Sequence, residues 1–247
     1  CVYDGNGPKG EKVAQEAGAE IVAAVEGSAA KVTDSSTDVP KVLKDAFVES
    51  NKKVCKLSSA EKSGCTATVI LVQDLTTLFV ANVGDSKAIL GKAEGSTWKA
   101  KVLTEEHKPN AAAEKARIEA AGGFVLEDED YGAARVFDTP DPVGQMVAMA
   151  SAGMSGGMGG DGMVSSMEPW PGLAMSRCLG HTGVDKIGIT AEPTVSTHKI
   201  FNDDQVLLVA SDGGKPPATH QRRSNPEQPT IEPQTSRVQD SARARVG

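Results

Sequence analysis

The sequence predicts an α+β fold, because two amphipathic helical segments precede a run of strands whose first pair forms a hairpin. In the first segment, about residues 9–26, apolar side chains recur at every fourth position, and Gly27 follows it. The second segment, about residues 39–56, places its Val, Leu, Ala and Phe side chains on one face. Residues 66–72 and 78–83 are β-branched or apolar runs joined by a short turn, which predicts a β-hairpin.

Weaker signals predict further strands and one more helix. Residues 1–3 are typical of a strand end that runs into a turn over residues 4–7. Further strands are expected over 87–90, 98–103, 194–198 and 205–210. A helix is expected over about 111–121, with Asn110 as its N-cap and a stop at Gly122 and Gly123.

Composition excludes several classes of partner. The chain has 247 residues and a formal net charge of −7, so it offers no basic surface for nucleic acid or an anionic membrane. No apolar run reaches the length of a membrane span. The 4 cysteines match no zinc-binding spacing and are too few for a disulfide framework. We therefore expect a monomer in a reducing compartment, the cytoplasm or the nucleus.

Two segments differ in composition from the rest. Residues 138 to about 166 are rich in Gly, Met and Ser, which predicts a flexible inserted loop. Residues 214–247 are rich in Pro, Gln and Arg, which predicts a disordered tail unrelated to the domain over residues 1–213. The chain opens in mid-strand without a methionine, and the composition changes abruptly after residue 213. We expect segments to be missing at both ends, and for the tail we favour truncation or an altered reading frame over a natural tail.

Two aspartates stand in the same local context. Asp4 and Asp212 each follow an apolar strand and precede a glycine. Strand ends hold side chains rigidly, and two facing carboxylates can bind hard divalent cations. A pair of such cations can lower the pKa of a shared water and make a hydroxide nucleophile for phosphate esters. Asp-Gly also occurs in ordinary turns, so neither residue is specific by itself.

A series of longer blocks makes the pattern specific. The blocks cover residues 2–7 (Val-Tyr-Asp-Gly-Asn-Gly), 63–67, 80–88, 103–109, 114–123, 173–180, 191–193 and 208–213. In sequence and order they resemble the signatures of the type 2C family of metal-dependent protein serine/threonine phosphatases. The resemblance extends over roughly residues 1–213 and is interrupted by the segment near 138–166.

The resemblance implies a four-layer fold, in which helices flank a central sandwich of two antiparallel sheets. It also implies hydrolysis of phosphoserine and phosphothreonine in phosphoproteins by water that two Mg²⁺ or Mn²⁺ ions activate. By position, Asp4 would bridge both metals, the Gly5 carbonyl would bind one, and Asp212 would bind a metal from the opposite strand. Glu106 stands where many members place an Asp linked to a third, weaker metal.

The chain departs from the family pattern at several positions. Asn6 replaces a histidine that acts as general acid, and an amide has no proton to give near neutral pH. General acid catalysis contributes roughly 10²–10⁴-fold in rate. His181 replaces an Asp, and an exposed loop position is the interpretation favoured for it. The family's N-terminal Arg and Glu and its final Asp have no counterparts in this sequence. A catalytically impaired pseudophosphatase that acts as a binding module is therefore the alternative function.

Three further residues carry local expectations. Asp85, in a Gly-Asp-Ser turn, is expected to cap that turn rather than to neighbour a metal. Cys65 is expected to be a buried structural thiol. Arg177 is expected to pair with an acidic side chain near the site rather than to bind substrate.

Overall fold

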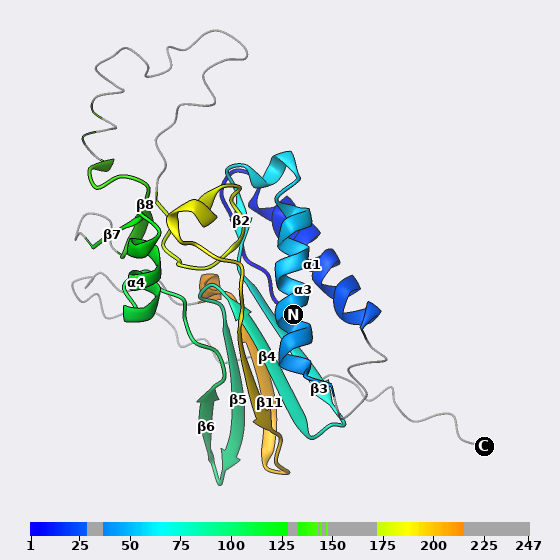
Figure 1. Ribbon diagram of the computed structural model, residues 1–247. Helices are drawn as coiled ribbons and strands as arrows, with labels where there is room; N and C mark the ends of the chain where they lie inside the picture. Colours follow the sequence, from blue (N-terminus) through cyan, green and yellow to red (C-terminus); the bar gives the residue numbers. More distant parts are fainter. Residues whose placement is uncertain (29–36, 128–132, 143, 145–146, 148–171, 215–247) are drawn as a thin grey trace, which may run out of the picture. The chain divides into compact units, whose positions relative to one another are not determined.

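Two long helices and two three-stranded antiparallel sheets are the largest elements of the described chain (Figure 1). The computed structural model describes residues 1–28, 37–127, 133–142, 144, 147 and 172–214. Most of the expected inserted loop and residues 215–247 of the expected tail lie outside these ranges. None of the described helices is both long and apolar enough to cross a membrane.

The two long helices form where the apolar periodicity predicts them. Helix α1 spans Gly10–Gly27, and α3 spans Val39–Val54, where the Asp38 side chain accepts a hydrogen bond from the Lys41 amide at 3.1 Å. The helices pack against each other, and α3 also packs against the strands of one sheet at Thr77–Val83 and Thr194–Lys199. Their buried side chains share a core with residues of that sheet, namely Val13, Ala17, Ile21, Val39, Leu43 and Phe47 with Ala67, Val69, Ala81 and Val83.

The sheets confirm the antiparallel strands and extend them. The first sheet has the order β10–β4–β3, with β3 at Ala67–Gln73, β4 at Thr77–Val83 and β10 at Thr194–Lys199. The second has the order β11–β5–β6, with β5 at Lys87–Glu94, β6 at Thr97–Val102 and β11 at Asp204–Ala210. Leu78 and Val80 of β4 pack in one buried cluster with Ala88 and Leu90 of β5. The two sheets therefore face each other, and α1 and α3 lie on the outer side of the first.

The outer face of the second sheet carries exposed apolar side chains. Val102, Leu208 and Val206 lie on this face, and Trp98 on it is 60% exposed. No helix among the residues described here is seen to pack on it. The fourth, helical layer that the family resemblance implies thus stays a prediction for this chain.

Three two-residue strands, which periodicity did not predict, form a small sheet of order β1–β2–β9. They are Gly5–Asn6, Gly64–Cys65 and Leu179–Gly180. Asn6 lies opposite Gly64, and Gly64 lies opposite Gly180. The Cys65 thiol is fully buried, as expected, and burial raises its pKa to about 12.

A smaller group of elements has its own core. Helix α4 spans Ala112–Ala120, followed by the hairpin of β7 (Phe124–Leu126) and β8 (Arg135–Phe137). Ile118, Val136 and Leu173 are buried together in this group. The expected Asn110 cap is wrong: the N-cap of α4 is Ala111, and no side chain caps the helix. The first N–H groups of α4 thus gain no side-chain acceptor at this position.

Candidate functional site

The backbone of Asp4 is held between two strand segments. The chain from Val2 onward runs antiparallel to Thr68, with an N–H to O distance of 2.9 Å in each direction. Next along, the Thr66 N–H donates to the Asp4 carbonyl at 2.9 Å, and the Asp4 N–H donates to Thr66 Oγ1 at 3.2 Å. Thr66 Oγ1 in turn lies 2.8 Å from Ser86 Oγ. These bonds fix the point from which the Asp4 carboxylate projects.

The fold brings Asp212 and Asp85 to the same place. The turn at residues 84–86 links β4 of one sheet to β5 of the other, and the end of β11 at Ala210 lies opposite Lys87. Burial raises the pKa of the Asp4 carboxyl, and a hydrogen bond with Asp212 and the negative charges of Asp212 and Asp85 raise it further. The Asp4 and Asp212 carboxyl groups therefore meet at one end of the sheet pair, with the charge of Asp85 nearby, and a divalent cation there would relieve their repulsion.

The donor set fits a cation only in part. Asp4 and Asp212 offer carboxylate oxygens, and the Gly5 carbonyl is next along β1, so these groups have the chemistry that Mg²⁺ or Mn²⁺ takes. Asp85 is buried and paired with Lys108. Its charge also acts on Asp4, so it lies near the carboxylate pair, and the turn cap expected of it stays a prediction. Within the described ranges, no group of three or more His, Cys, Asp or Glu side chains is arranged to hold a metal ion.

Glu106, the expected partner of a third metal, forms an ion pair with Lys87 at the start of β5. The described structure thus brings Asp4 and Asp212 together and pairs Glu106 with Lys87.

His181 is buried, so the expectation of an exposed loop position is wrong. The residue directly follows β9 and has a φ of +48°, a conformation in which His is one of the few tolerated side chains. Its N–H donates to the Ser63 carbonyl at 2.8 Å, and its imidazole Nε2 contacts Asn6 Oδ1. Burial lowers the pKa of His181 to about 4, so the ring is neutral at physiological pH. Sequence alone missed this contact because it depends on the register of β1, β2 and β9.

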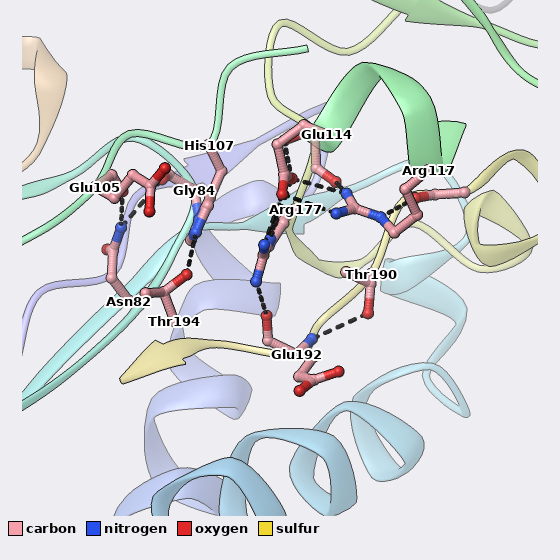
Figure 2. A network of polar contacts seen from close by, with 12 residues as sticks. Asn82, Gly84, Glu105, His107, Glu114, Arg117, Arg177, Thr190, Glu192 and Thr194 are labelled. Carbon is pink, nitrogen blue, oxygen red and sulfur yellow. Dashed lines mark hydrogen bonds and ion pairs between the residues drawn. The ribbon is translucent and has the colours of Figure 1, made fainter. Parts of the chain in front are cut away.

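A second buried histidine, which sequence reasoning passed over, secures the turn beside the site. His107 Nδ1 accepts the Gly84 N–H at 3.1 Å, so Nε2 carries the proton and donates to Thr194 Oγ1 at 2.8 Å (Figure 2). Asn82 Nδ2 donates to the Glu105 carbonyl at 2.8 Å. These bonds tie the segment that carries Glu106 and Lys108 to the turn that carries Asp85. The sequence feature that could have pointed to His107 is the Glu-Glu-His-Lys-Pro block at residues 105–109.

The burial of His107 makes stability depend on pH. Burial, followed by the charge of Arg177, lowers the pKa of His107 from 6.5 to about 4 in the folded chain. Between these values the unfolded chain binds more protons, so the free energy of unfolding falls as the pH falls from about 6.5. This one residue should cost about 2 kcal/mol between pH 7 and pH 5.

The variant His107→Gln lacks this titration and should lose about 2 kcal/mol less over the same interval. Urea unfolding of both proteins at pH 7 and pH 5 measures the difference. The same pH dependence in both proteins would show that His107 titrates alike in the folded and unfolded chains.

Glu114 connects α4 to the segment that carries Ser176 and Arg177, and it also pairs with Arg117 of its own helix (Figure 2). Arg177 Nη2 donates to Glu114 Oε1 at 2.6 Å, Arg117 donates to both carboxylate oxygens at 2.8 Å, and Ser176 Oγ donates at 2.5 Å. Burial by itself would raise the pKa of Glu114, but the bonds from Arg117, Arg177 and Ser176 hold it well below its usual range. Arg177 also donates to the Glu192 carbonyl at 3.0 Å. The expectation that Arg177 pairs with an acid is confirmed, with Glu114 as that acid.

Facing antiparallel sheets with a helix layer, and paired carboxylates at one end, define an α+β protein with a candidate divalent-cation site. A family model described as protein phosphatase 2C matches residues 1–213. The chain is 32% identical over 222 residues to protein phosphatase 2C homolog 2 of Aspergillus fumigatus, which covers 86% of this chain and 40% of that relative. It is 32% identical over 216 residues to probable protein phosphatase 2C 61 of Arabidopsis thaliana, and the match covers 86% of this chain and 58% of that relative. The chain belongs to the protein phosphatase 2C family.

A solved structure agrees with the fold. The serine-threonine phosphatase 2C from Toxoplasma gondii superimposes with a TM-score of 0.65 at 17% sequence identity, covering 85% of this chain and 66% of that chain. At this identity the likeness supports the fold alone. The chain spans 40% of the length of the Aspergillus relative and 58% of the Arabidopsis one.

Proposed function

We propose that this chain acts in a protein serine/threonine phosphatase that hydrolyses phosphoserine and phosphothreonine in phosphoproteins with the aid of Mg²⁺ or Mn²⁺. The observation that carries the proposal is the meeting of the Asp4 and Asp212 carboxyl groups, from opposite ends of the sequence, at one end of the sheet pair. Membership of the protein phosphatase 2C family supports the same reaction.

In this proposal Asp4, Asp212 and the Gly5 carbonyl hold the metal. Glu106, which precedes His107, is proposed as a ligand of a further, weaker metal. A bound divalent cation supplies a lowered pKa for a coordinated water and positive charge for phosphoryl oxygens. Asn6, beside Asp4 in sequence, offers an amide N–H₂ that donates a hydrogen bond but transfers no proton. The leaving group must therefore depart without a general acid at position 6.

That property gives the proposal a sharp test with two substrates. A serine or threonine alkoxide needs a proton to leave, whereas p-nitrophenolate is stable without one. We expect Mn²⁺-dependent hydrolysis of p-nitrophenyl phosphate by the full chain. Hydrolysis of a phosphothreonine peptide should be about 10²–10⁴-fold slower than in a chain with a general acid at position 6.

The assay compares the two rates with Mn²⁺, with Mg²⁺ and with EDTA. The variant Asn6→His should accelerate the peptide reaction more than the p-nitrophenyl phosphate reaction. Phosphopeptide binding without turnover of either substrate would support the binding-module alternative. Turnover that survives EDTA would contradict a metal-dependent phosphatase.

A further inference from the structure

Two departures from the family pattern, which lie 175 positions apart in sequence, meet in one contact. Asn6 in β1 lies opposite Gly64 in β2, and Gly64 lies opposite Gly180 in β9. His181 follows Gly180, and its imidazole ring lies over Gly64, where a Cβ atom would overlap ring atom Cδ2. The ring reaches Asn6 because the middle strand has no side chain at this point.

The hydrogen-bonding chemistry decides which atom donates. Asn6 Oδ1 can only accept, so His181 Nε2 must carry the proton in this contact. On the other side of the amide, Asn6 Nδ2 lies 3.9 Å from the sulfur of Met175. A thioether sulfur has no hydrogen to donate, so the reversed amide would place Oδ1 against an atom that cannot satisfy it. The contacts therefore favour one orientation of the Asn6 amide.

The backbone holds the imidazole in this position. The His181 N–H donates to the Ser63 carbonyl at 2.8 Å, and the Val184 N–H donates to the His181 carbonyl at 3.1 Å. Non-glycine residues with positive φ cost free energy and persist where their surroundings enforce them. The His181 ring is thus placed by a three-strand register and by a constrained turn together.

The amide N–H₂ of Asn6 keeps donor capacity in this orientation. The Met175 sulfur is a weak acceptor, and it can take at most one of the two amide hydrogens. Asn6 lies two residues beyond Asp4, on the segment that leads from the carboxylate pair. An oriented, uncharged donor at this position suits an anionic oxygen, because preorganised donors cost no reorganisation when the anion arrives.

We propose that His181 is a positioning residue for Asn6: its Nε2–H orients the Asn6 amide, whose N–H₂ donates to an oxygen of a bound phosphoryl group. This inference rests on the proposed function. In it His181 is not a replacement general acid, because the proton on Nε2 is donated to Asn6. At position 6, where the family has a proton-donating histidine, Asn6 and His181 thus provide a fixed hydrogen-bond donor for phosphate.

Position 181 allows a graded set of variants. His181→Gln places its amide nitrogen as far from the backbone as Nε2 and retains an N–H donor toward Asn6 Oδ1. His181→Glu has the same length and the same backbone cost at this positive φ, but it opposes Asn6 Oδ1 with a second acceptor, so the Asn6 amide should rotate by 180°. His198→Gln is the matched control, because His198 lies on β10 and bonds with Ser196 Oγ at 2.9 Å, away from the carboxylate pair.

The first measurement needs no turnover. Nitrogen-15 NMR of the metal-free chain reports the tautomer of His181 and the side-chain amide of Asn6. We expect a neutral ring with the proton on Nε2, and an Asn6 amide signal that moves in His181→Glu but little in His181→Gln. A ring protonated on Nδ1 alone would overturn the inference, and so would an Asn6 signal that is indifferent to both variants.

The second measurement is binding of inorganic phosphate to the Mn²⁺-loaded chain by calorimetry. We expect His181→Glu to weaken phosphate binding about 10-fold, the loss typical of one hydrogen bond to a charged group. His181→Gln and His198→Gln should stay within about 3-fold, which is less than half of that free-energy loss. Mn²⁺ affinity should be unchanged in all three. Equal phosphate affinity in His181→Glu and His181→Gln overturns the inference, as does a lack of phosphate binding by the unmodified chain.

These outcomes separate the inference from the proposed function. If the chain binds phosphate with the expected dependence on His181 but hydrolyses neither substrate, the positioning role stands and the phosphatase proposal fails. If it hydrolyses p-nitrophenyl phosphate with Mn²⁺ while His181→Glu binds phosphate normally, the phosphatase proposal stands and the positioning role fails.

Discussion

The variant Asp4→Asn is expected to weaken Mn²⁺ binding by more than about 100-fold, because outer-shell partners alone typically contribute 10–100-fold and Asp4 is the proposed direct ligand. In the metal-free chain the same change should increase the stability of the fold. It removes a carboxylate that is partly buried and repelled by Asp212 and Asp85. The melting temperature at neutral pH should rise by about 2–4 °C, the shift that roughly 1 kcal/mol gives in a chain of this length.

Opposite signs for binding and stability are the distinguishing result. Calorimetric titration with Mn²⁺ and thermal unfolding with EDTA measure the two effects. The matched control is Asp74→Asn, at an exposed turn residue with a φ of 52° that Asn also adopts readily. The control should leave Mn²⁺ binding unchanged. If Asp4→Asn binds Mn²⁺ like the unmodified chain, the proposed metal site is wrong.

The second large effect is expected at Glu114, where Glu114→Ala should lower the free energy of unfolding by about 3–5 kcal/mol. The Glu114 side chain is 7% exposed and accepts hydrogen bonds from Arg117, Arg177 and Ser176. Removing the carboxylate leaves both guanidinium groups, which are themselves largely buried, without their shared counter-charge. Removing one partner of a buried ion pair costs more than the pair contributes, because the remaining charge stays desolvated.

The control for this prediction lies on the same helix. Glu119 pairs with Lys115 at 4.0 Å, and its side chain is 54% exposed. Glu119→Ala should change stability by no more than about 0.5 kcal/mol, as exposed pairs generally do. Urea unfolding of both variants gives the comparison. Similar losses in the two variants would mean that the Glu114 network does not hold α4 to the rest of the chain.

The parts of the fold that sequence predicted are those with strong local periodicity. Helices α1 and α3 follow from apolar residues that recur once per helical turn, and the β3–β4 hairpin follows from two β-branched runs around a turn. The two-residue strands β1, β2 and β9 were not predicted, because two residues are too few to show a period. The expected cap at Asn110 failed for a related reason, since a cap is set by the backbone around it.

The residues of the candidate site also fall into those that the sequence predicted and those that only the tertiary structure revealed. By itself the sequence determined the family, through ordered blocks over residues 1–213, and it singled out Asp4 and Asp212 by their position after apolar strands. Only the tertiary structure places the charge of Asp85 near that pair and pairs Glu106 with Lys87.

Tertiary structure alone also decided that Asn6 and His181 form one contact. The physical reason is register: residues far apart in sequence meet only when strands pair, and a shift of one residue would turn each side chain to the other face. A sequence can therefore name the residues of this site, but the pairing of β1, β2 and β9 determines which of them touch.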